Sequence, residues 1–201
     1  MHATDADLGA PLQTLQCRLH RLDVRNPETI TAFAAQLADR PVDVLLNVAG
    51  AMVPEEQDSL ATVNKETLTK LFETNAFGPL LLTQALLPSL LLSPSPRVGI
   101  VSSRVGSIGD NTSGGTYAYR ASKAAVNSFG RNLAVDLREQ GVVVCLLHPG
   151  FVRSNLNAAA AAHPESVEPE EAAEKLWGVL MGKGIEETGR FWHREGMELP
   201  W

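Results

Sequence analysis

Three short, mainly apolar runs constrain the fold of this chain more than any other feature. They cover residues 42–48, 98–101 and 142–147, and small or turn-forming residues close each of them. Strands that are apolar at every position are typical of parallel sheets covered on both faces. Segments with apolar residues three and four apart separate these runs and predict helices. This alternation of strand and helix predicts an α/β layered fold with parallel strands.

The remaining elements are expected on the same grounds. Asn26 and Pro27 fit the cap and the first residue of a helix that begins after a short apolar run. Other helices are expected at 65–92 (interrupted at Gly78-Pro79), 117–138 and 170–181, and other strands at 16–24 and 190–193. No repeat, linker or shift in composition divides the chain, so we expect residues 1–201 to form a single domain.

Charge and cysteine content exclude several classes of protein. The 201 residues include 17 Lys and Arg against 23 Asp and Glu, a net charge of −6 without blocks of like charge. This argues against binding to nucleic acid or to an anionic membrane. The longest apolar stretch, residues 77–92, is shorter than the roughly 20 residues that span a bilayer, and the acidic start is not a secretory signal. Cys17 and Cys145 are interpreted as buried thiols, so we expect a soluble, cytoplasmic protein.

Tyr119 and Lys123 form the strongest local signal. Residues four apart on a helix share a face, so the phenol and the ammonium group can meet there. A phenol has a pKa of about 10, and a nearby cation lowers that value. Tyr119 could then act as a general acid or base. A tyrosine and a lysine at this spacing also occur as simple surface neighbours, so the pair alone does not establish catalysis.

Polar residues also lie at the carboxyl ends of two of the apolar runs, where an open parallel sheet binds ligands. Ser102-Ser103 could hydrogen-bond a substrate carbonyl, and Asn47 precedes small residues that let a ligand approach the backbone. Asn75 interrupts an apolar helix and needs partners if it is buried. Each of these also has a structural interpretation, because serine often ends a strand in a turn and a buried asparagine often bonds the backbone.

Taken together, these positions resemble the short-chain dehydrogenase/reductase family, from about Leu19 to the C-terminus. The second half is most similar to the C-factor or sniffer-like carbonyl-reductase branch, which also has a longer loop between its serine and its tyrosine. The motifs in register are Asp23-Val24, Asn47-x-Ala49-Gly50, Asn75, Ser103, Tyr119-x-x-x-Lys123, Pro149-Gly150 and the tail at 196–201.

This resemblance implies a Rossmann-like, doubly wound parallel sheet and hydride transfer between NADP or NAD and a small carbonyl or secondary alcohol. It makes Tyr119 the proton donor or acceptor, while Lys123 lowers the tyrosine pKa and holds the nicotinamide ribose. Ser103 would orient the carbonyl, with Ser107 as the fallback, and Asn75 would support a water-linked proton relay. The implied cofactor contacts are Asp23 and Val24 at the adenine, Asn47, Ala49 and Gly50 along the cofactor, and Pro149, Gly150 and Val152 near the nicotinamide.

The chain departs from the family at its start. The glycine-rich turn that binds the pyrophosphate is missing, so we expect a sheet without its first β-α-β unit. Glycines at 178, 182 and 184 have the right spacing, but they end a helix instead of opening one. An alternative is therefore an inactive, truncated family member that serves as an interaction module or comes from a shortened gene.

Two further alternatives concern partners and chemistry. The family commonly dimerises through the helices that carry Asn75 and Tyr119, and a homodimer would use the leucines at 80, 81, 82 and 86. A hydrolase built on Ser103 and His148 is disfavoured, because no Gly-x-Ser-x-Gly elbow surrounds the serine.

Overall fold

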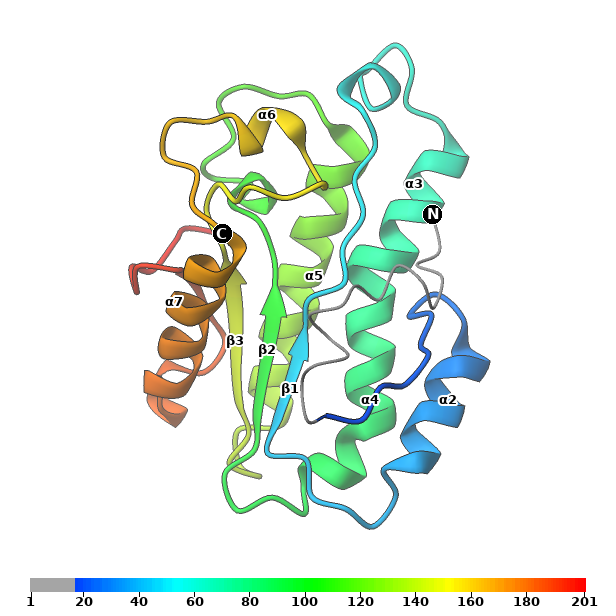
Figure 1. Cartoon of the computed structure of the whole chain (residues 1–201), viewed down its shortest axis with the longest axis vertical. Coiled ribbons are helices and arrows are strands. Elements are labelled where there is room, and N and C mark those ends of the chain that lie inside the picture. Colours follow the sequence, from blue (N-terminus) through cyan, green and yellow to red (C-terminus); the bar gives the residue numbers. More distant parts are fainter. Residues whose placement is uncertain (1–16) are drawn as a thin grey trace.

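A four-stranded parallel sheet forms the centre of the computed structural model, which describes residues 17–201 (Figure 1). The strands lie side by side in chain order and every neighbouring pair is parallel, as the apolar runs predicted. Their bounds are β1 (Val44–Asn47), β2 (Arg97–Val101), β3 (Val143–His148) and β4 (Arg190–His193).

Helices cover both faces of this sheet, which confirms the Rossmann-like α/β fold. Apolar side chains of α4 and α5 form one core with one face of the strands, and α2 packs against α4. On the opposite face α7 packs on β3 (Figure 1). The helices are α2 (Pro27–Gln36), α3 (Lys65–Phe72), α4 (Gly78–Leu90), α5 (Tyr117–Asp136), α6 (Ala158–Ala161) and α7 (Pro169–Gly182). Single 3₁₀ turns occupy Glu55–Gln57, Arg104–Gly106 and Ile185–Glu187.

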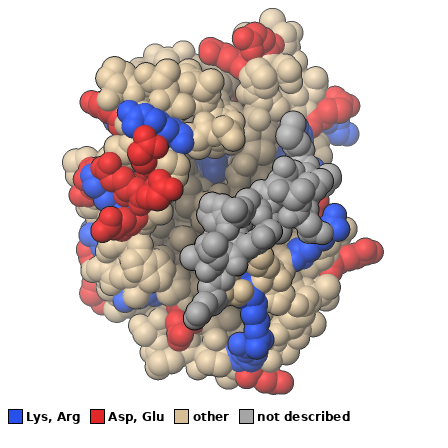
Figure 2. Space-filling view, viewed as in Figure 1, with Lys and Arg blue, Asp and Glu red and all other residues tan. Residues whose placement is uncertain are grey.

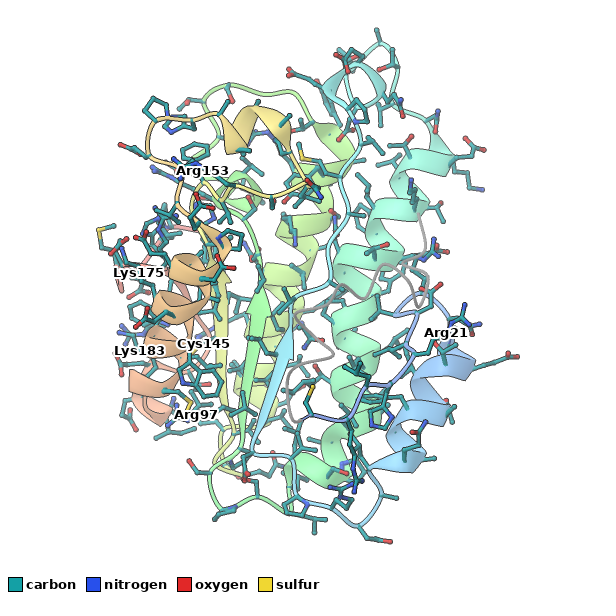
Figure 3. All side chains as sticks on the ribbon, viewed as in Figure 1. Arg21, Arg97, Cys145, Arg153, Lys175 and Lys183 are labelled. Carbon is teal, nitrogen blue, oxygen red and sulfur yellow. The ribbon has the colours of Figure 1, made fainter. Side chains whose placement is uncertain are left out.

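Strand β3 shows how the two cores divide the sheet. Val144 and Leu146 join the core beneath α4 and α5, whereas Cys145 and Leu147 join the one beneath α7. Successive side chains of a strand point to opposite faces, so a run that is apolar throughout fills both cores. The prediction that Cys145 is buried is confirmed, and burial raises the pKa of its thiol to about 12. Figure 3 shows Cys145 beside Arg97, whose guanidinium donates to backbone carbonyls at the C-terminal end of α7.

The strand expected at 16–24 is wrong for the part that the structure describes. A strand needs a hydrogen-bonded neighbour, and within residues 17–201 β1 pairs only with β2. The chain instead turns at Asp23, whose carbonyl accepts from the Asn26 N–H and the Thr29 hydroxyl as α2 begins. Cys17, predicted to be buried in that strand, is exposed.

Burial of the first apolar run is also less extensive than predicted. Leu45 and Asn47 of β1 are buried, but Leu46 is 41% exposed and Val48 is 60% exposed. The reason is geometric, since α7 packs on β3, two strands away from β1. The prediction of a strand covered on both faces therefore holds for β3 and fails for β1.

The interruption of the long helix lies one turn earlier than predicted. A π-helical turn at Glu73–Phe77 separates α3 from α4 and carries Asn75, and Gly78 opens α4 just after it. A methyl group on Gly78 would lie 2.9 Å from the Val24 side chain, so only glycine lets this helix approach the turn before α2. Wider π turns are rare and are frequent at functional sites.

The leucines expected on a dimer surface are mostly turned inward. Leu82 and Leu86 are buried in the core beneath the sheet, and Leu80 is half-buried, whereas Leu81 is exposed. Residues four apart on a helix share a face, and in α4 this shared face is the one that packs on the strands. The part of that predicted surface formed by Leu82 and Leu86 is therefore wrong. Within residues 17–201, no helix combines the length and apolar character needed to cross a membrane.

Candidate active site

The candidate catalytic residues converge beyond the carboxyl ends of β1 and β2. Tyr119 and Lys123 lie on the first turns of α5, Ser103 follows β2, and Asn75 comes from the π turn before α4. Figure 2 shows that the molecule is hollowed on this face, beyond the ends of these strands. Ligands of open α/β sheets bind at this edge, so the side chains stand where a substrate would be expected.

Tyr119 is held in a small apolar cluster with its hydroxyl on a serine. Its ring packs with Val53, Leu71 and Ala118, and the side chain is 8% exposed. Burial raises the pKa of the Tyr119 phenol, and the hydrogen bond with Ser103 partly offsets that shift. The expected lowering of this pKa by Lys123 is therefore not the net effect in this structure. A phenol with a raised pKa keeps its proton at neutral pH and is suited to donate it.

Lys123 is a buried cation with few partners. It is 4% exposed, and its Nζ donates to the Val101 carbonyl at 2.9 Å and lies 5.9 Å from the centre of the Tyr119 ring. Within residues 17–201 no carboxylate forms a salt bridge with it. Burial lowers the pKa of Lys123 to about 8. The ammonium group thus retains free donor capacity beside the tyrosine.

Asn75 connects the loop after β1 to α5. Its Oδ1 accepts from the Ala51 N–H at 2.7 Å, and its Nδ2 donates to the Ala51 carbonyl at 2.9 Å and to the Ser122 hydroxyl at 3.0 Å. The side chain is 1% exposed, so these bonds satisfy an amide that water does not reach. In this structure Asn75 fixes the two walls of the site relative to each other.

Of the predicted cofactor residues in and around β1, some border the site and others do not. Ala49 and Gly50 are exposed, and a methyl group on Gly50 would lie 3.7 Å from both the Lys123 Nζ and the Asn75 Oδ1, so this backbone borders the site. Asn47 instead turns toward α4 and donates to the Thr83 hydroxyl at 3.4 Å. Asp23 pairs with Arg25 at 2.8 Å, and Val24 packs on Gly78, so neither is brought next to Lys123 by a contact that the structure shows.

Comparison with known proteins identifies the family. A family model described as short chain dehydrogenase matches residues 3–165. This chain belongs to the short chain dehydrogenase family. This match extends upstream of Leu19, the start of the motifs that carry the resemblance.

Two relatives and one solved structure agree with the carbonyl-reductase branch of the family. A 1-hydroxy-2-glutathionyl-2-methyl-3-butene dehydrogenase from Rhodococcus sp. (strain AD45) is 42% identical over 198 residues, covering 98% of this chain and 84% of the relative. C-signal from Myxococcus xanthus is 41% identical over 170 residues, covering 85% and 99%. The NADPH-bound carbonyl reductase from chicken fatty liver superposes with a TM-score of 0.78 at 29% identity, covering 90% of this chain and 75% of that one.

Ser107 and His148, the residues of the alternative hypotheses, are hydrogen-bonded to the backbone. Ser107 is 1% exposed and its hydroxyl accepts from the Asp110 N–H, whereas Ser103 is the serine that affects the pKa of Tyr119. His148 Nδ1 accepts from the Arg104 N–H at 3.3 Å, and burial lowers the pKa of His148 to about 3. A histidine with so low a pKa is a poor base, which removes the support for a hydrolase built on Ser103.

An arginine that the sequence analysis missed joins the two ends of the loop after β3. Arg194 is 8% exposed, and its guanidinium donates to the carbonyls of Pro149 (2.7 Å), Phe151 (3.0 Å) and Glu165 (3.3 Å). Gly150, at φ +69°, leaves no room for a side chain, because a methyl group there would lie 2.6 Å from the guanidinium. Arg194 therefore joins both ends of the loop that includes Val152. The sequence around Arg194, directly after β4, contains no pattern that would predict hydrogen bonds to this loop.

Replacing Arg194 with methionine should loosen this loop while leaving the core folded. Three backbone carbonyls lose their shared donor, so we expect hydrogen exchange of residues 151–167 to quicken about tenfold or more. Exchange mass spectrometry measures this directly. Arg153→Met is the matched control, since Arg153 is 50% exposed and its guanidinium pairs, among residues 17–201, with the exposed Glu168 alone. Equal exchange in the wild type and Arg194→Met would show that the guanidinium does not hold the loop.

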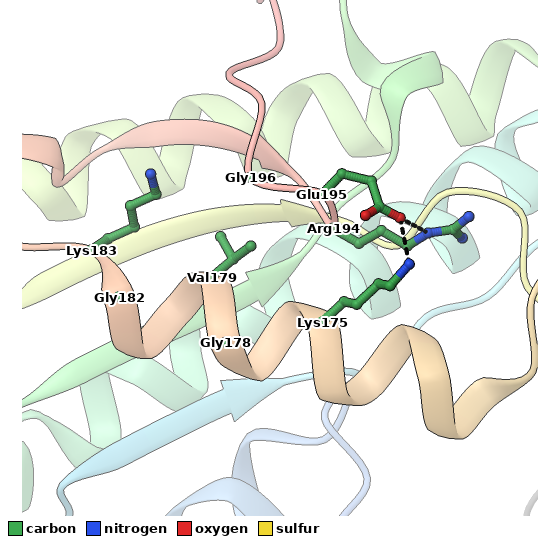
Figure 4. Close-up of a pocket in the computed structure, with 8 residues that line it drawn as sticks. All are labelled: Lys175, Gly178, Val179, Gly182, Lys183, Arg194, Glu195 and Gly196. Atoms are coloured by element: carbon green, nitrogen blue, oxygen red, sulfur yellow. Dashed lines mark hydrogen bonds and ion pairs between the residues drawn. The ribbon is translucent and has the colours of Figure 1, made fainter.

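A second hollow lies apart from this site. Between α7 and the turn after β4 is a groove of about 370 Å³ (Figure 4). Its charges are already paired, because Glu195 accepts from Lys175 at 2.8 Å and from Arg194 at 3.3 Å. Tyr119, Lys123, Ser103 and Asn75 do not line it. We therefore assign the chemistry to the edge of the sheet and not to this groove.

Proposed function

We propose that this protein is an NAD(P)-dependent oxidoreductase that transfers hydride between the nicotinamide and a small carbonyl compound or the corresponding alcohol. The observation that carries the proposal is the placement of Tyr119, Ser103 and Lys123 at the carboxyl edge of the sheet, with the Lys123 Nζ 5.9 Å from the centre of the Tyr119 ring and Ser103 directly after β2. Membership of the short chain dehydrogenase family supports the same reaction class.

The chain's own residues supply the proton and orient the substrate. In the reducing direction the carbonyl carbon gains the hydride that a reduced nicotinamide supplies when bound, and the carbonyl oxygen gains a proton. Tyr119 donates this proton, since its raised pKa keeps the phenol protonated. Ser103 shares the carbonyl oxygen as a second hydrogen-bond partner. Lys123 places a positive charge beside the phenol and stabilises the phenolate that proton transfer leaves.

The residues present fit the nicotinamide half of a dinucleotide. Lys123 is a buried ammonium group with spare donors, and the exposed Gly50 backbone leaves an open border beside it. Lys123 would hold the ribose hydroxyls, and Pro149, Gly150 and Val152 would border the nicotinamide. Asp23, Val24 and Asn47 remain candidates for the more distant parts. The similarity to the NADPH-bound carbonyl reductase from chicken fatty liver supports a nicotinamide cofactor here.

One relative suggests a class of substrates, while the partner and the location are proposed on other grounds. The Rhodococcus relative is named for a hydroxy compound that carries a glutathionyl group, so such alcohols join small ketones as candidate substrates. A homodimer through α4 and α5 is proposed because the family commonly dimerises through the corresponding helices. Sedimentation tests this proposal. A cytoplasmic location agrees with the free thiols of Cys17 and Cys145.

Cofactor titration tests the proposal most directly. NADPH and NADH fluorescence is followed as purified protein is added, and we expect saturable binding of one of them in the micromolar range or below. A panel of small ketones, aldehydes and glutathionyl alcohols then gives turnover. The absence of binding at millimolar concentrations of both cofactors would refute the enzyme and favour an interaction module.

A further inference from the structure

Asp58 is a completely buried carboxylate that contacts the helix carrying the candidate catalytic pair. It is 0% exposed and lies in the loop after β1, directly after the 3₁₀ turn at Glu55–Gln57. It is distant from α5 in the sequence, and nothing in its local pattern marks it. A buried carboxylate is costly unless it is hydrogen-bonded, so its partners indicate what the fold gains from it.

All of those partners are at the start of α5. The Ala118 N–H donates to one carboxylate oxygen at 2.7 Å and the Tyr119 N–H to the other at 3.0 Å. The Tyr117 N–H donates to the Asp58 backbone carbonyl at 3.2 Å. The next amide, that of Arg120, already bonds within the helix, to the Thr116 carbonyl. Asp58 thus satisfies the three amides at this end of α5 that have no partner in the helix.

Thr116, the residue directly before α5, does not cap these amides. Thr116 occupies the normal cap position, but its backbone is left-handed (φ 42°, ψ 54°) and its side chain makes no capping bond. A cap residue normally has an extended backbone, from which its side chain can reach back to the helix. The cap of α5 is therefore supplied from another segment. Its negative charge also suits the positive end of the helix dipole.

We infer that Asp58 is a positioning residue that fixes the phenol of Tyr119 through the backbone amide of the same residue. This inference rests on the proposed function, because it assigns Asp58 a task in placing the proton donor. A frayed first turn would move the Tyr119 ring within its cluster of Val53, Leu71 and Ala118. Displacements of about 1 Å at a reacting group can cost about a hundredfold in rate.

Asp58→Asn tests this with little change in shape. It keeps one oxygen for one amide but turns an NH₂ group toward the other. We expect the amides of residues 117–119 to exchange about tenfold faster or more, and kcat to fall about tenfold or more, with Kd for the cofactor within about twofold. Asn64→Ala is the matched control, because it removes the cap of α3, in which the Asn64 Oδ1 accepts from the Thr67 N–H at 2.9 Å. This control should leave the amides of residues 117–119 and kcat unchanged.

Several outcomes would overturn the inference. One is unchanged exchange and turnover in Asp58→Asn, and another is an equal loss of turnover in Asn64→Ala. The wild type provides a test that needs no variant, since its amides at 117–119 should exchange as slowly as those in the middle of α5. Exchange there as fast as in the first turn of α2 would refute the cap. If the wild type proves inactive while Asp58→Asn still speeds exchange at 117–119, the proposed function fails and the cap on Tyr119 stands.

Discussion

Replacing Tyr119 with phenylalanine should lower kcat by about 10²- to 10⁴-fold, which is the range that a positioned general acid contributes. The change removes one oxygen from a side chain that is 8% exposed and leaves the ring among Val53, Leu71 and Ala118. The proton then has to come from water, in a site where the Ser103 hydroxyl has lost its partner. Binding of the cofactor should change little. Single-turnover measurements with saturating cofactor separate the chemical step from binding.

The second tyrosine of the chain provides the control. Tyr117 lies two residues earlier on α5 but is 44% exposed, so it points away from the buried cluster. Tyr117→Phe should retain the activity and stability of the wild type. If Tyr119→Phe retained wild-type turnover, Tyr119 would not be the proton donor, and the proposed mechanism would have to be abandoned.

The strand and helix pattern could be predicted wherever other helices or strands of residues 17–201 pack over the apolar run. The parallel order and the run at 142–147 followed from burial, because β3 is covered by α5 on one side and α7 on the other. The same reasoning failed at residues 16–24 and at Leu46. In both places the strand pairing or the helix cover that a buried strand needs is missing within residues 17–201, and periodicity in one segment carries no information about its neighbour.

The proximity of Tyr119 and Lys123 was predictable because their spacing has a physical meaning on a helix. Tyr119 and Lys123 share a face of α5, and the family pattern selected Ser103 over Ser107. The direction of the Tyr119 pKa shift was not predictable, since it depends on how completely loops from other parts of the chain cover the ring. Asp58 and Arg194 were missed for a related reason. Each acts on a backbone far away in the sequence, and such contacts exist only after folding.

Replacing Lys123 with methionine should have opposite effects on activity and stability. The ammonium group is buried, and within residues 17–201 its one hydrogen-bond acceptor is the Val101 carbonyl. Methionine fills similar space without a charge, so we expect the free energy of unfolding at pH 7 to rise by about 1 kcal/mol. Turnover should fall about a hundredfold or more, because the phenolate left by Tyr119 loses its counter-charge and the cofactor loses a ribose contact. Denaturant titration and steady-state kinetics measure the two effects.

The dependence on pH identifies the buried amine as the cause. The pKa of Lys123 is lowered by burial to about 8, whereas an unfolded lysine titrates near 10.4. Between these values the unfolded chain binds more protons than the folded one, so the lysine makes stability rise with pH. Relative to Lys123→Met, the wild type should therefore gain about 1–3 kcal/mol between pH 8 and pH 10.4, with little change below pH 7. Lys65→Met, at an exposed position, should show no such rise. A constant difference between the wild type and Lys123→Met across this range would mean that the amine titrates as it does in water, and the lowering of its pKa by burial would be wrong.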